Sequence, residues 1–178
     1  MIITVTGGAR SGKSRFAEHF FNRDEAICYI ATGKALDEEM EARIAAHRQS
    51  RPAHWRTFEQ QEHLEHALGE EDHYILDDVT NLVGELLYRE SQDMRDLSDL
   101  VIQQVEEKSV RILDDLLDLA LRREKSILLV TNEVGSSIVP ENKAARVFRD
   151  IQGRVNQHLA HRSDQVYLVC CGIPVKIK

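Results

Sequence analysis

The chain has 178 residues, of which 42% are hydrophobic and 30% are charged, and its formal net charge at pH 7 is −7. This length suits one domain with a full hydrophobic core and is short for two, so we expect a single domain over residues 1–178. The acidic balance argues against a nucleic-acid binder, which usually carries a basic stripe. Basic residues gather instead in segments 43–56 and 143–154, which is typical of a site for an anionic small molecule.

We expect neither a secretory leader nor a membrane span. The chain begins MIITVTGG, without the basic region that opens a leader. Its apolar runs all fall short of the roughly 20 residues that cross a bilayer. The three cysteines, Cys28, Cys170 and Cys171, lack C-x-x-C spacing and predict reduced, buried thiols in a cytoplasmic protein.

Five apolar runs have the character of strands that are buried on both faces of a sheet. Each run is continuous rather than alternating and is rich in β-branched or aromatic residues, which favours a parallel sheet covered by helices. The runs are 2–6, 27–31, 74–78, 126–131 and 164–171. Residues 55–59 are a weaker candidate, and 174–178 predict an antiparallel edge strand after the turn at Gly172.

Helical patterns separate these runs and complete an alternation of strands and helices. They cover residues 13–22, 37–49, 60–68, 79–90, 97–123 and 141–161, and the polar stretch 89–96 predicts a loop. Such alternation predicts an α/β fold with a mostly parallel sheet and right-handed crossovers.

The segment GGARSGKS, residues 7–14, matches the phosphate-loop pattern G-x-x-x-x-G-K-[ST] between a strand and a helix. Its glycines let backbone N–H groups approach phosphate oxygens, and the helix N-terminus behind them favours anions. We expect Lys13 to reach the β- and γ-phosphates of a nucleoside triphosphate, and the Ser14 hydroxyl to ligate Mg²⁺. The predicted fold is therefore a three-layer phosphate-loop NTPase fold of the RecA-like type, with helices on both faces of the sheet.

Two aspartates end the run YILDD, where phosphate-loop enzymes place a second carboxylate that holds Mg²⁺. The pattern does not choose between Asp77 and Asp78, and Asp78 also suits the N-cap of the next helix. A kinase, a motor and a regulatory GTPase all share these features. The stretch TNEV, residues 131–134, lacks the lysine and the aspartate of a guanine-reading N-K-x-D motif, which argues against a GTPase.

The segment RIAAHRQSRPAHW, residues 43–55, places two histidines among three arginines. The plain interpretation of His47 is a half-buried histidine at a helix end. A neutral imidazole is also a nucleophile toward activated phosphates, and Arg48 and Arg51 would stabilise the charge that builds up there. Residue chemistry leaves four candidates open, and the basic flank favours the first two: His47, His54, His63 and His66.

Six segments resemble the bifunctional adenosylcobinamide kinase / adenosylcobinamide-phosphate guanylyltransferase family of cobalamin biosynthesis. The resemblance runs over essentially the whole chain and is far more specific than the phosphate loop alone. Its carriers are TGGARSGKS (6–14), YIAT (29–32), DEEMEARI (37–44), RPAHWRT (51–57), TNEVGSSIVPEN (131–142) and RDIQGRVNQ (149–157).

The resemblance implies roles for individual residues. His47, shortly before the R-P-x-x-W segment, matches the histidine that becomes guanylylated, and His54 does not; Lys13 is the second catalytic residue. Asp77 matches the metal carboxylate that acts with Ser14, while relatives often carry cysteine in place of Asp78. The implied nucleotide contacts are Gly7, Gly8, Ala9, Arg10, Ser11, Gly12, Lys13, Ser14, Ala31, Thr32, Gly33, Arg48, Gln49, Ser50, Arg51, Glu59 and Asp77.

The resemblance also implies a reaction and an assembly. Adenosylcobinamide would be phosphorylated with ATP or GTP in the presence of Mg²⁺, and GMP from GTP would then pass through His47 to adenosylcobinamide phosphate, in a homotrimer. Asn132 and Glu133 are candidates for contact with the acceptor or the metal-bound water. Arg149 and Arg154 are candidates for holding phosphate, with plain exposed helix residues as an equal alternative. The rival functions are a simple small-molecule kinase with a structural His47 and a RecA-like regulatory or motor module.

Overall fold

The computed structural model describes residues 1–33, 45, 48 and 51–178, and the strands among these residues form one seven-stranded sheet. The strand order is β3-β2-β4-β5-β1-β6-β7, and only β6 and β7 pair antiparallel. The strands are β1 (Ile2–Thr6), β2 (Ile27–Ala31), β3 (Arg56–Glu59), β4 (His73–Asp77), β5 (Ser126–Val130), β6 (Gln165–Cys170) and β7 (Ile173–Lys176).

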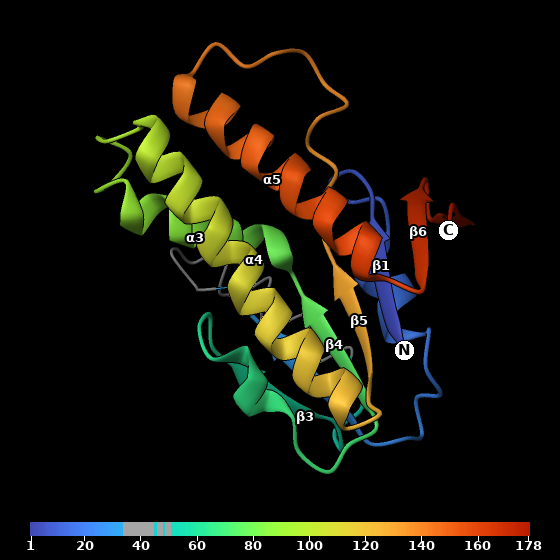
Figure 1. Ribbon diagram of the computed structural model, residues 1–178. Coiled ribbons are helices and arrows are strands. Elements are labelled where there is room, and N and C mark those ends of the chain that lie inside the picture. Colours follow the sequence, from blue (N-terminus) through green and yellow to red (C-terminus); the bar gives the residue numbers. More distant parts are fainter. Residues whose placement is uncertain (34–44, 46–47, 49–50) are drawn as a thin grey trace.

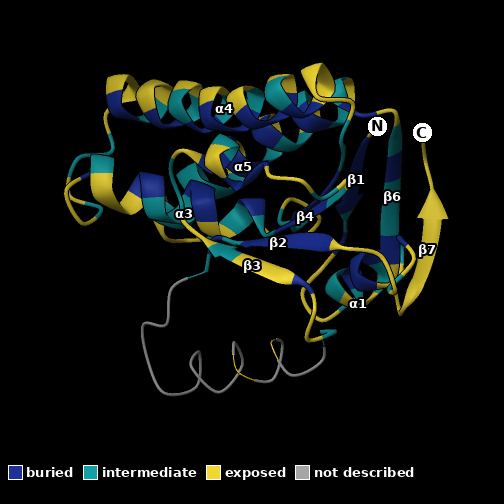
Figure 2. Cartoon of the chain, turned by 90° about the horizontal axis from the view of Figure 1, so that it is seen from below, coloured by how far each residue is buried: buried dark blue, intermediate teal, exposed yellow. Residues whose placement is uncertain are grey.

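Helices cover both faces of this sheet, as Figures 1 and 2 show. The described helices are α1 (Lys13–Glu18), the 3-10 turn η1 (Leu64–Ala67), α3 (Val79–Glu90), α4 (Asp99–Arg122) and α5 (Lys143–Arg162). Helices α3, α4 and α5 lie on one side of the sheet, and α1 lies on the other. The predicted three-layer α/β fold with a mostly parallel sheet and an antiparallel C-terminal edge strand is confirmed.

Two apolar clusters, one on each face of the sheet, explain why the sequences of the central strands are continuously hydrophobic. The larger cluster fills the space between the sheet and α3, α4 and α5, and the apolar stripe of α4 faces it. The smaller cluster, under α1, contains Phe21, Tyr29 and Trp55. Since each central strand sends alternate side chains into different clusters, both of its faces are apolar. The outermost β7 is exposed along its whole length.

The strand predictions agree with the structure to within one or two residues at most ends, and two helix predictions need correction. The helix predicted over 13–22 ends at Glu18, because His19 and Phe20 donate to carbonyls three residues back and tighten the last turn. The helix predicted over 60–68 is wrong beyond the short η1, because His63 has a φ of 55° and the right-handed helix cannot continue through it. The helix predicted over 37–49 falls outside the described residues.

The cysteines only partly match the expectation of buried thiols. Cys28 is buried in β2, and burial raises the pKa of its thiol to about 12. Cys170 and Cys171 are exposed, because β6 leaves the core there and turns into β7, so the prediction is wrong for this pair. Among the described residues, no helix combines the length and apolar character that a membrane crossing needs.

Candidate functional site

The carboxyl ends of five neighbouring strands lie level with one another. Glu59 of β3 pairs in register with Ala31 of β2, Ala31 with Asp77 of β4, Asp77 with Val130 of β5, and Val130 with Val5 of β1. The phosphate loop begins directly after β1, so it opens at the same edge as Glu59, Ala31 and Asp77. Open α/β folds bind ligands at this edge of the sheet. The fold therefore brings together four groups of predicted site residues that are far apart in sequence.

Two glycines give the phosphate loop its shape. Gly7 has a φ of 155°, and a Cβ added there would lie 2.3 Å from the carbonyl oxygen of Val169. Gly12, just before α1, has a φ of 100°. A side chain at either position would strain the backbone, and at Gly7 it would also collide with β6. Glycine at position 7 therefore allows the loop to lie close to the backbone of β6.

Lys13 lies inside the loop that it is predicted to serve. The residue is 7% exposed, and its ammonium donates a hydrogen bond of 2.7 Å to the carbonyl oxygen of Gly8. Ser14 follows in the first turn of α1 and is partly exposed. A cation and a hydroxyl at the mouth of a glycine-rich loop are the groups that neutralise nucleotide phosphates and bind their metal ion.

Two segments that are distant in sequence donate backbone hydrogen bonds to the phosphate loop. The backbone N–H of Glu133, after β5, donates to the carbonyl oxygen of Gly7 at 3.0 Å. The backbone N–H of Gly172, in the β6–β7 turn, donates to the carbonyl oxygen of Ser11 at 2.9 Å. The contact of Gly172 could not be predicted from the sequence, because a backbone hydrogen bond between two distant turns does not depend on any local sequence pattern. The loop is therefore held at Gly7 by the segment after β5 and at Ser11 by the β6–β7 turn.

The two aspartates after β4 have different partners. Asp78 Oδ1 accepts from the backbone N–H of Asn81 at 2.7 Å, and Oδ2 accepts from the Asn132 side chain at 3.1 Å. Burial, with the negative charge of Asp77 as the second cause, raises the pKa of the Asp78 carboxyl to about 6. The predicted N-cap role of Asp78 is confirmed. Both of its oxygens are engaged in holding the chain.

Asp77 keeps one oxygen available. Its Oδ2 accepts a hydrogen bond from the phenol of Tyr29, and its Oδ1 receives none from the residues that the structure describes. Burial and the charge of Asp77 raise the pKa of the Tyr29 phenol well above its usual range. The geometry thus favours Asp77 over Asp78 as the carboxylate for a metal ion, which stays a prediction.

The stretch after β2 is used to hold the strand ends together. Thr32 is 1% exposed, and its hydroxyl donates to the carbonyl oxygen of Asp78 at 2.6 Å. Gln61 donates to the carbonyl oxygen of Thr32 at 2.7 Å. Because the Thr32 side chain is buried and hydrogen-bonded to Asp78, a nucleotide contact of Thr32 or Gly33 would come from their backbone.

The two described arginines of the histidine segment have different surroundings. Arg48 donates to Glu59 at the end of β3, and both side chains are about half exposed. The guanidinium of Arg51 lies over the ring of Tyr29, 3.3 Å from its centroid, and its side chain is 9% exposed. The phosphate contact expected of Arg51 stays a prediction. The predicted residues His47, Gln49 and Ser50 lie outside the described residues.

The other candidate histidines are less suitable. His54 is exposed, and its Nε2 lies 3.2 Å from the carbonyl oxygen of Glu25, which precedes β2. This position is at the amino ends of β2 and β3, opposite the phosphate loop. The rings of His63 and His66 stack on each other, 5.4 Å apart, at the surface of η1. Of these three histidines, His54 thus lies at the edge of the sheet opposite the phosphate loop.

The loop after β5 is fastened to the site mainly by Asn132. Its side chain donates to Asp78, and its carbonyl oxygen accepts from the Asn156 side chain at 3.0 Å. The carboxylate of Glu133 instead accepts from the backbone N–H groups of Gly135 and Ser136, within its own loop. Asn132 therefore positions Asp78, whereas Glu133 shapes the loop.

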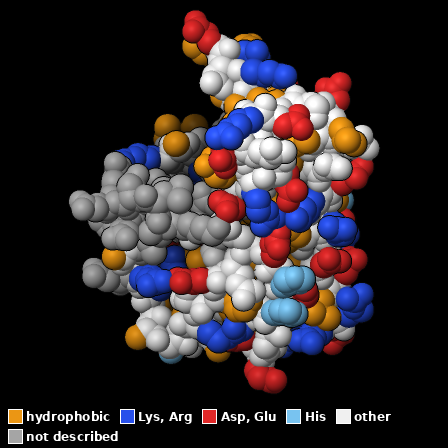
Figure 3. All heavy atoms as spheres, turned by 90° about the vertical axis from the view of Figure 1, so that its left-hand side faces the viewer, with side chains coloured by type: hydrophobic (Ala, Val, Ile, Leu, Met, Phe, Trp, Pro, Cys, Tyr) orange, Lys and Arg blue, Asp and Glu red, His pale blue; other side chains and the backbone are white. Residues whose placement is uncertain are grey.

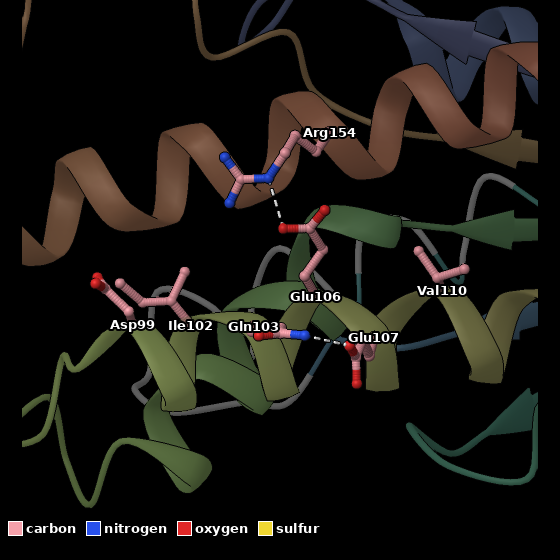
Figure 4. A pocket seen from close by; sticks show the side chains of 7 residues that line it. All are labelled: Asp99, Ile102, Gln103, Glu106, Glu107, Val110 and Arg154. Atoms are coloured by element: carbon pink, nitrogen blue, oxygen red, sulfur yellow. Dashed lines mark hydrogen bonds and ion pairs between the residues drawn. The ribbon is translucent and has the colours of Figure 1, made fainter.

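Arg154 lies in a pocket that does not involve the phosphate loop. Figure 4 shows it reaching from α5 to Glu106 of α4, where its Nε lies 2.5 Å from Oε2. Arg149 pairs with its neighbour Asp150. The pocket has a volume of about 450 Å³ and is lined by Asp99, Ile102, Gln103, Glu106, Glu107, Val110 and Arg154. With three carboxylates against one guanidinium, this pocket does not favour a phosphate, and a phosphate-holding role of Arg154 finds no support.

The described surface has no extended basic field on the face in Figure 3, where acidic and basic side chains alternate. Among the described residues, no group of three or more His, Cys, Asp or Glu side chains is placed to hold a metal ion. Ser14 and Asp77 carry oxygen donors, which are the ligands that Mg²⁺ prefers. Their predicted role as ligands of one metal ion stays a prediction.

Comparisons with known proteins agree with these features. The family model described as cobinamide kinase / cobinamide phosphate guanyltransferase matches residues 3–177. The bifunctional adenosylcobalamin biosynthesis protein CobU of Escherichia coli K12 is 47% identical over 182 residues, which cover 100% of both chains. The protein of the same name from Salmonella typhimurium LT2 is 45% identical over 184 residues, again covering 100% of both.

Among solved structures, the P4 protein of bacteriophage phi6 in complex with ADP matches 97% of this chain and 52% of its own, at 16% identity and a TM-score of 0.47. The fold is instead established by the strand order and the phosphate loop. The match over residues 3–177 and the two full-length relatives establish the family. The chain belongs to the cobinamide kinase / cobinamide phosphate guanyltransferase family of enzymes.

Proposed function

We propose that the chain phosphorylates adenosylcobinamide with ATP or GTP and then transfers GMP from GTP to the resulting adenosylcobinamide phosphate. The product would be adenosylcobinamide-GDP, formed in cobalamin nucleotide-loop assembly and corrinoid salvage. The observation that carries the proposal is the family match over residues 3–177. It is supported by the edge of the sheet that unites the phosphate loop, Asp77 and the Arg48–Glu59 pair.

In the kinase step, the hydroxyl oxygen of the aminopropanol arm attacks the γ-phosphorus of the bound triphosphate. The bond between the γ-phosphorus and the β–γ bridging oxygen breaks, the nucleoside diphosphate leaves, and the hydroxyl proton passes to solvent. Lys13 neutralises charge on the β- and γ-phosphates from inside the loop. The backbone N–H groups of the loop fix the phosphates in line for the attack.

Mg²⁺ would be held by the Ser14 hydroxyl and the Asp77 carboxylate, together with nucleotide oxygens. These are hard oxygen donors, which suit this ion. When bound, it supplies positive charge that offsets the charge of the transferring phosphoryl group. The Tyr29 hydrogen bond to Oδ2 leaves Asp77 Oδ1 as the oxygen for this role.

In the transferase step, an imidazole nitrogen of His47 attacks the α-phosphorus of GTP. A nitrogen–phosphorus bond forms, and the bond from the α-phosphorus to the α–β bridging oxygen breaks, so that pyrophosphate leaves. A phosphate oxygen of adenosylcobinamide phosphate then attacks the same phosphorus and displaces the imidazole. Support comes from Arg48, the next residue in sequence, which pairs with Glu59 at the carboxyl edge.

Labelled GTP separates this mechanism from its rivals. Incubation with GTP labelled in the α-phosphate should give an acid-labile, base-stable label on the protein. The label should be lost in His47→Ala and kept in His54→Ala, because His54 lies at the opposite edge of the sheet. Label only from the γ-phosphate, or none, would contradict guanylyl transfer and favour a simple kinase. NTP turnover that depends on a protein partner and not on a corrinoid would favour a motor or regulatory module.

We further propose a cytoplasmic homotrimer, as the family resemblance implies. Light scattering of the purified protein should give a mass three times that of the 20.4 kDa chain. A monomer at micromolar concentration would contradict this assembly.

A further inference from the structure

Tyr29 is a buried residue next to the proposed metal site. It lies in the middle of β2, is 1% exposed, and pairs in register with Ile75 of β4. Asp77 lies two residues further along β4, on the same face of the sheet as Tyr29, because side chains alternate along a strand. This diagonal position lets the phenol reach across the strands and donate to Asp77 Oδ2.

Arg51 holds the ring of Tyr29 from its face. Its guanidinium carbon lies 3.3 Å from the ring centroid, and its Nε lies 3.8 Å from Oε1 of Glu18, near the end of α1. All three side chains are buried or nearly so. A cation over an aromatic face is attracted to the ring, and this attraction is stronger in a desolvated site, so Arg51 favours this orientation of the Tyr29 ring. Tyr29 thus connects Asp77 to the buried side chains of Arg51 and Glu18.

We infer that Tyr29 is a positioning residue that fixes the Asp77 carboxylate, so that Oδ1 stays available to the divalent cation of the bound nucleotide. The inference rests on the proposed function, in which Asp77 shares that cation with Ser14. Groups that hydrogen-bond to a metal-binding carboxylate orient it, and their loss typically lowers metal affinity about 10- to 100-fold. Tyr29 itself touches neither metal nor substrate.

The chain offers a matched control in Tyr74. This residue is also a fully buried tyrosine of a central strand, and its hydroxyl accepts from the backbone N–H of Gly69 and donates to the carboxylate of Glu71. These partners lie before β4, at the amino edge of the sheet. Tyr29→Phe and Tyr74→Phe therefore each remove one buried hydroxyl from a carboxylate, but only the first affects Asp77. A purely structural role would give both variants the same behaviour.

The experiment measures Mn²⁺ binding by electron paramagnetic resonance in the presence of a non-hydrolysable GTP analogue. Tyr29→Phe should raise the Kd for Mn²⁺ at least about 10-fold, with nucleotide binding in EDTA unchanged, and Tyr74→Phe should stay within twofold of the wild type. Thermal melting would record the folding of each variant. An unchanged Mn²⁺ affinity in Tyr29→Phe, or an equal loss in both variants, would overturn the inference.

Asp77→Asn separates failure of this inference from failure of the metal assignment. Combined with Tyr29→Phe, it should give no further loss of Mn²⁺ affinity, because Tyr29 acts through Asp77. If Asp77→Asn alone leaves the affinity unchanged, the proposed metal role of Asp77 is wrong and the inference is overturned with it. If Asp77→Asn weakens binding and Tyr29→Phe does not, only the inference is overturned.

Discussion

The backbone N–H of Gly172 donates a hydrogen bond of 2.9 Å to the carbonyl oxygen of Ser11, so the β6–β7 turn holds the middle of the phosphate loop. Both central residues of this turn have positive φ, 52° at Cys171 and 80° at Gly172. Such two-residue hairpins match the twist of the strands and need residues that tolerate this backbone. The last hairpin of the chain is therefore part of the support of the nucleotide site.

Gly172→Ala should lower the free energy of unfolding by about 1 kcal/mol, because an L-residue is strained at that φ. Gly153→Ala, in the interior of α5, should raise it by about 0.5–1 kcal/mol. A Cβ at either position meets nothing within 4 Å, so the opposite signs come from the backbone alone. Urea unfolding of the two variants checks this pair, and a loss of stability in both would contradict it.

Gly7→Ala should strongly weaken nucleotide binding, because its Cβ would lie 2.3 Å from the carbonyl oxygen of Val169 and the loop would have to move. Gly8→Ala is the matched control, since a Cβ there meets nothing within 4 Å. Titration with a fluorescent GTP analogue should show at least about a 100-fold weaker Kd for Gly7→Ala, equivalent to about 2.7 kcal/mol. Equal affinities in the two variants would show that this close approach does not shape the site.

Glu71 should contribute to stability at neutral pH. The pKa of the Glu71 carboxyl is lowered, and the largest cause is the hydrogen bond that Arg56 donates to it. A folded-state pKa below the unfolded value gives stability that is present above the unfolded value, about 4.5, and is lost as the pH falls through the folded value. Glu71→Gln should therefore cost about 1 kcal/mol at pH 7 and progressively less under acid conditions.

Asp150→Asn is the control for this pH dependence, because Asp150 is exposed and its ion pair with the neighbouring Arg149 should contribute only a few tenths of a kcal/mol. Urea unfolding between pH 3 and pH 7 would compare the two variants with the wild type. A difference between Glu71→Gln and the wild type that is constant across this range would exclude the proposed linkage.

The three thiols should differ in reactivity. Cys170 and Cys171 are exposed, with their sulfur atoms 3.8 Å apart, whereas Cys28 is buried. Hydrogen bonding to Cys171 raises the pKa of Cys170, so its modification should speed up as the pH increases. Ellman's reagent should titrate two thiols in the folded protein and the third only in denaturant, and Cys28→Ser should leave the native count at two. Reaction of all three thiols under native conditions would contradict the packing of β2.

Local patterns were enough to predict the strands, the phosphate loop and the cap at Asp78. In each case the residues that determine the feature are neighbours in sequence, as in the run of residues 7–14. The links from Tyr29 to Asp77 and from Gly172 to Ser11 could not be predicted, because they join residues 48 or more positions apart and depend on strand order. The contact between Arg51 and Tyr29 could not be predicted either, because these residues are also far apart in sequence, and the nucleotide contact of Arg51 stays a prediction.

One chain should both phosphorylate and guanylylate a corrinoid. The most direct test incubates the purified protein with adenosylcobinamide, GTP and Mg²⁺ and analyses the products by mass spectrometry. We expect adenosylcobinamide phosphate to appear first and adenosylcobinamide-GDP to follow with an equal amount of pyrophosphate, and Lys13→Ala should make neither. If the reaction stops at adenosylcobinamide phosphate, or if the corrinoid is unchanged, the proposed function is contradicted.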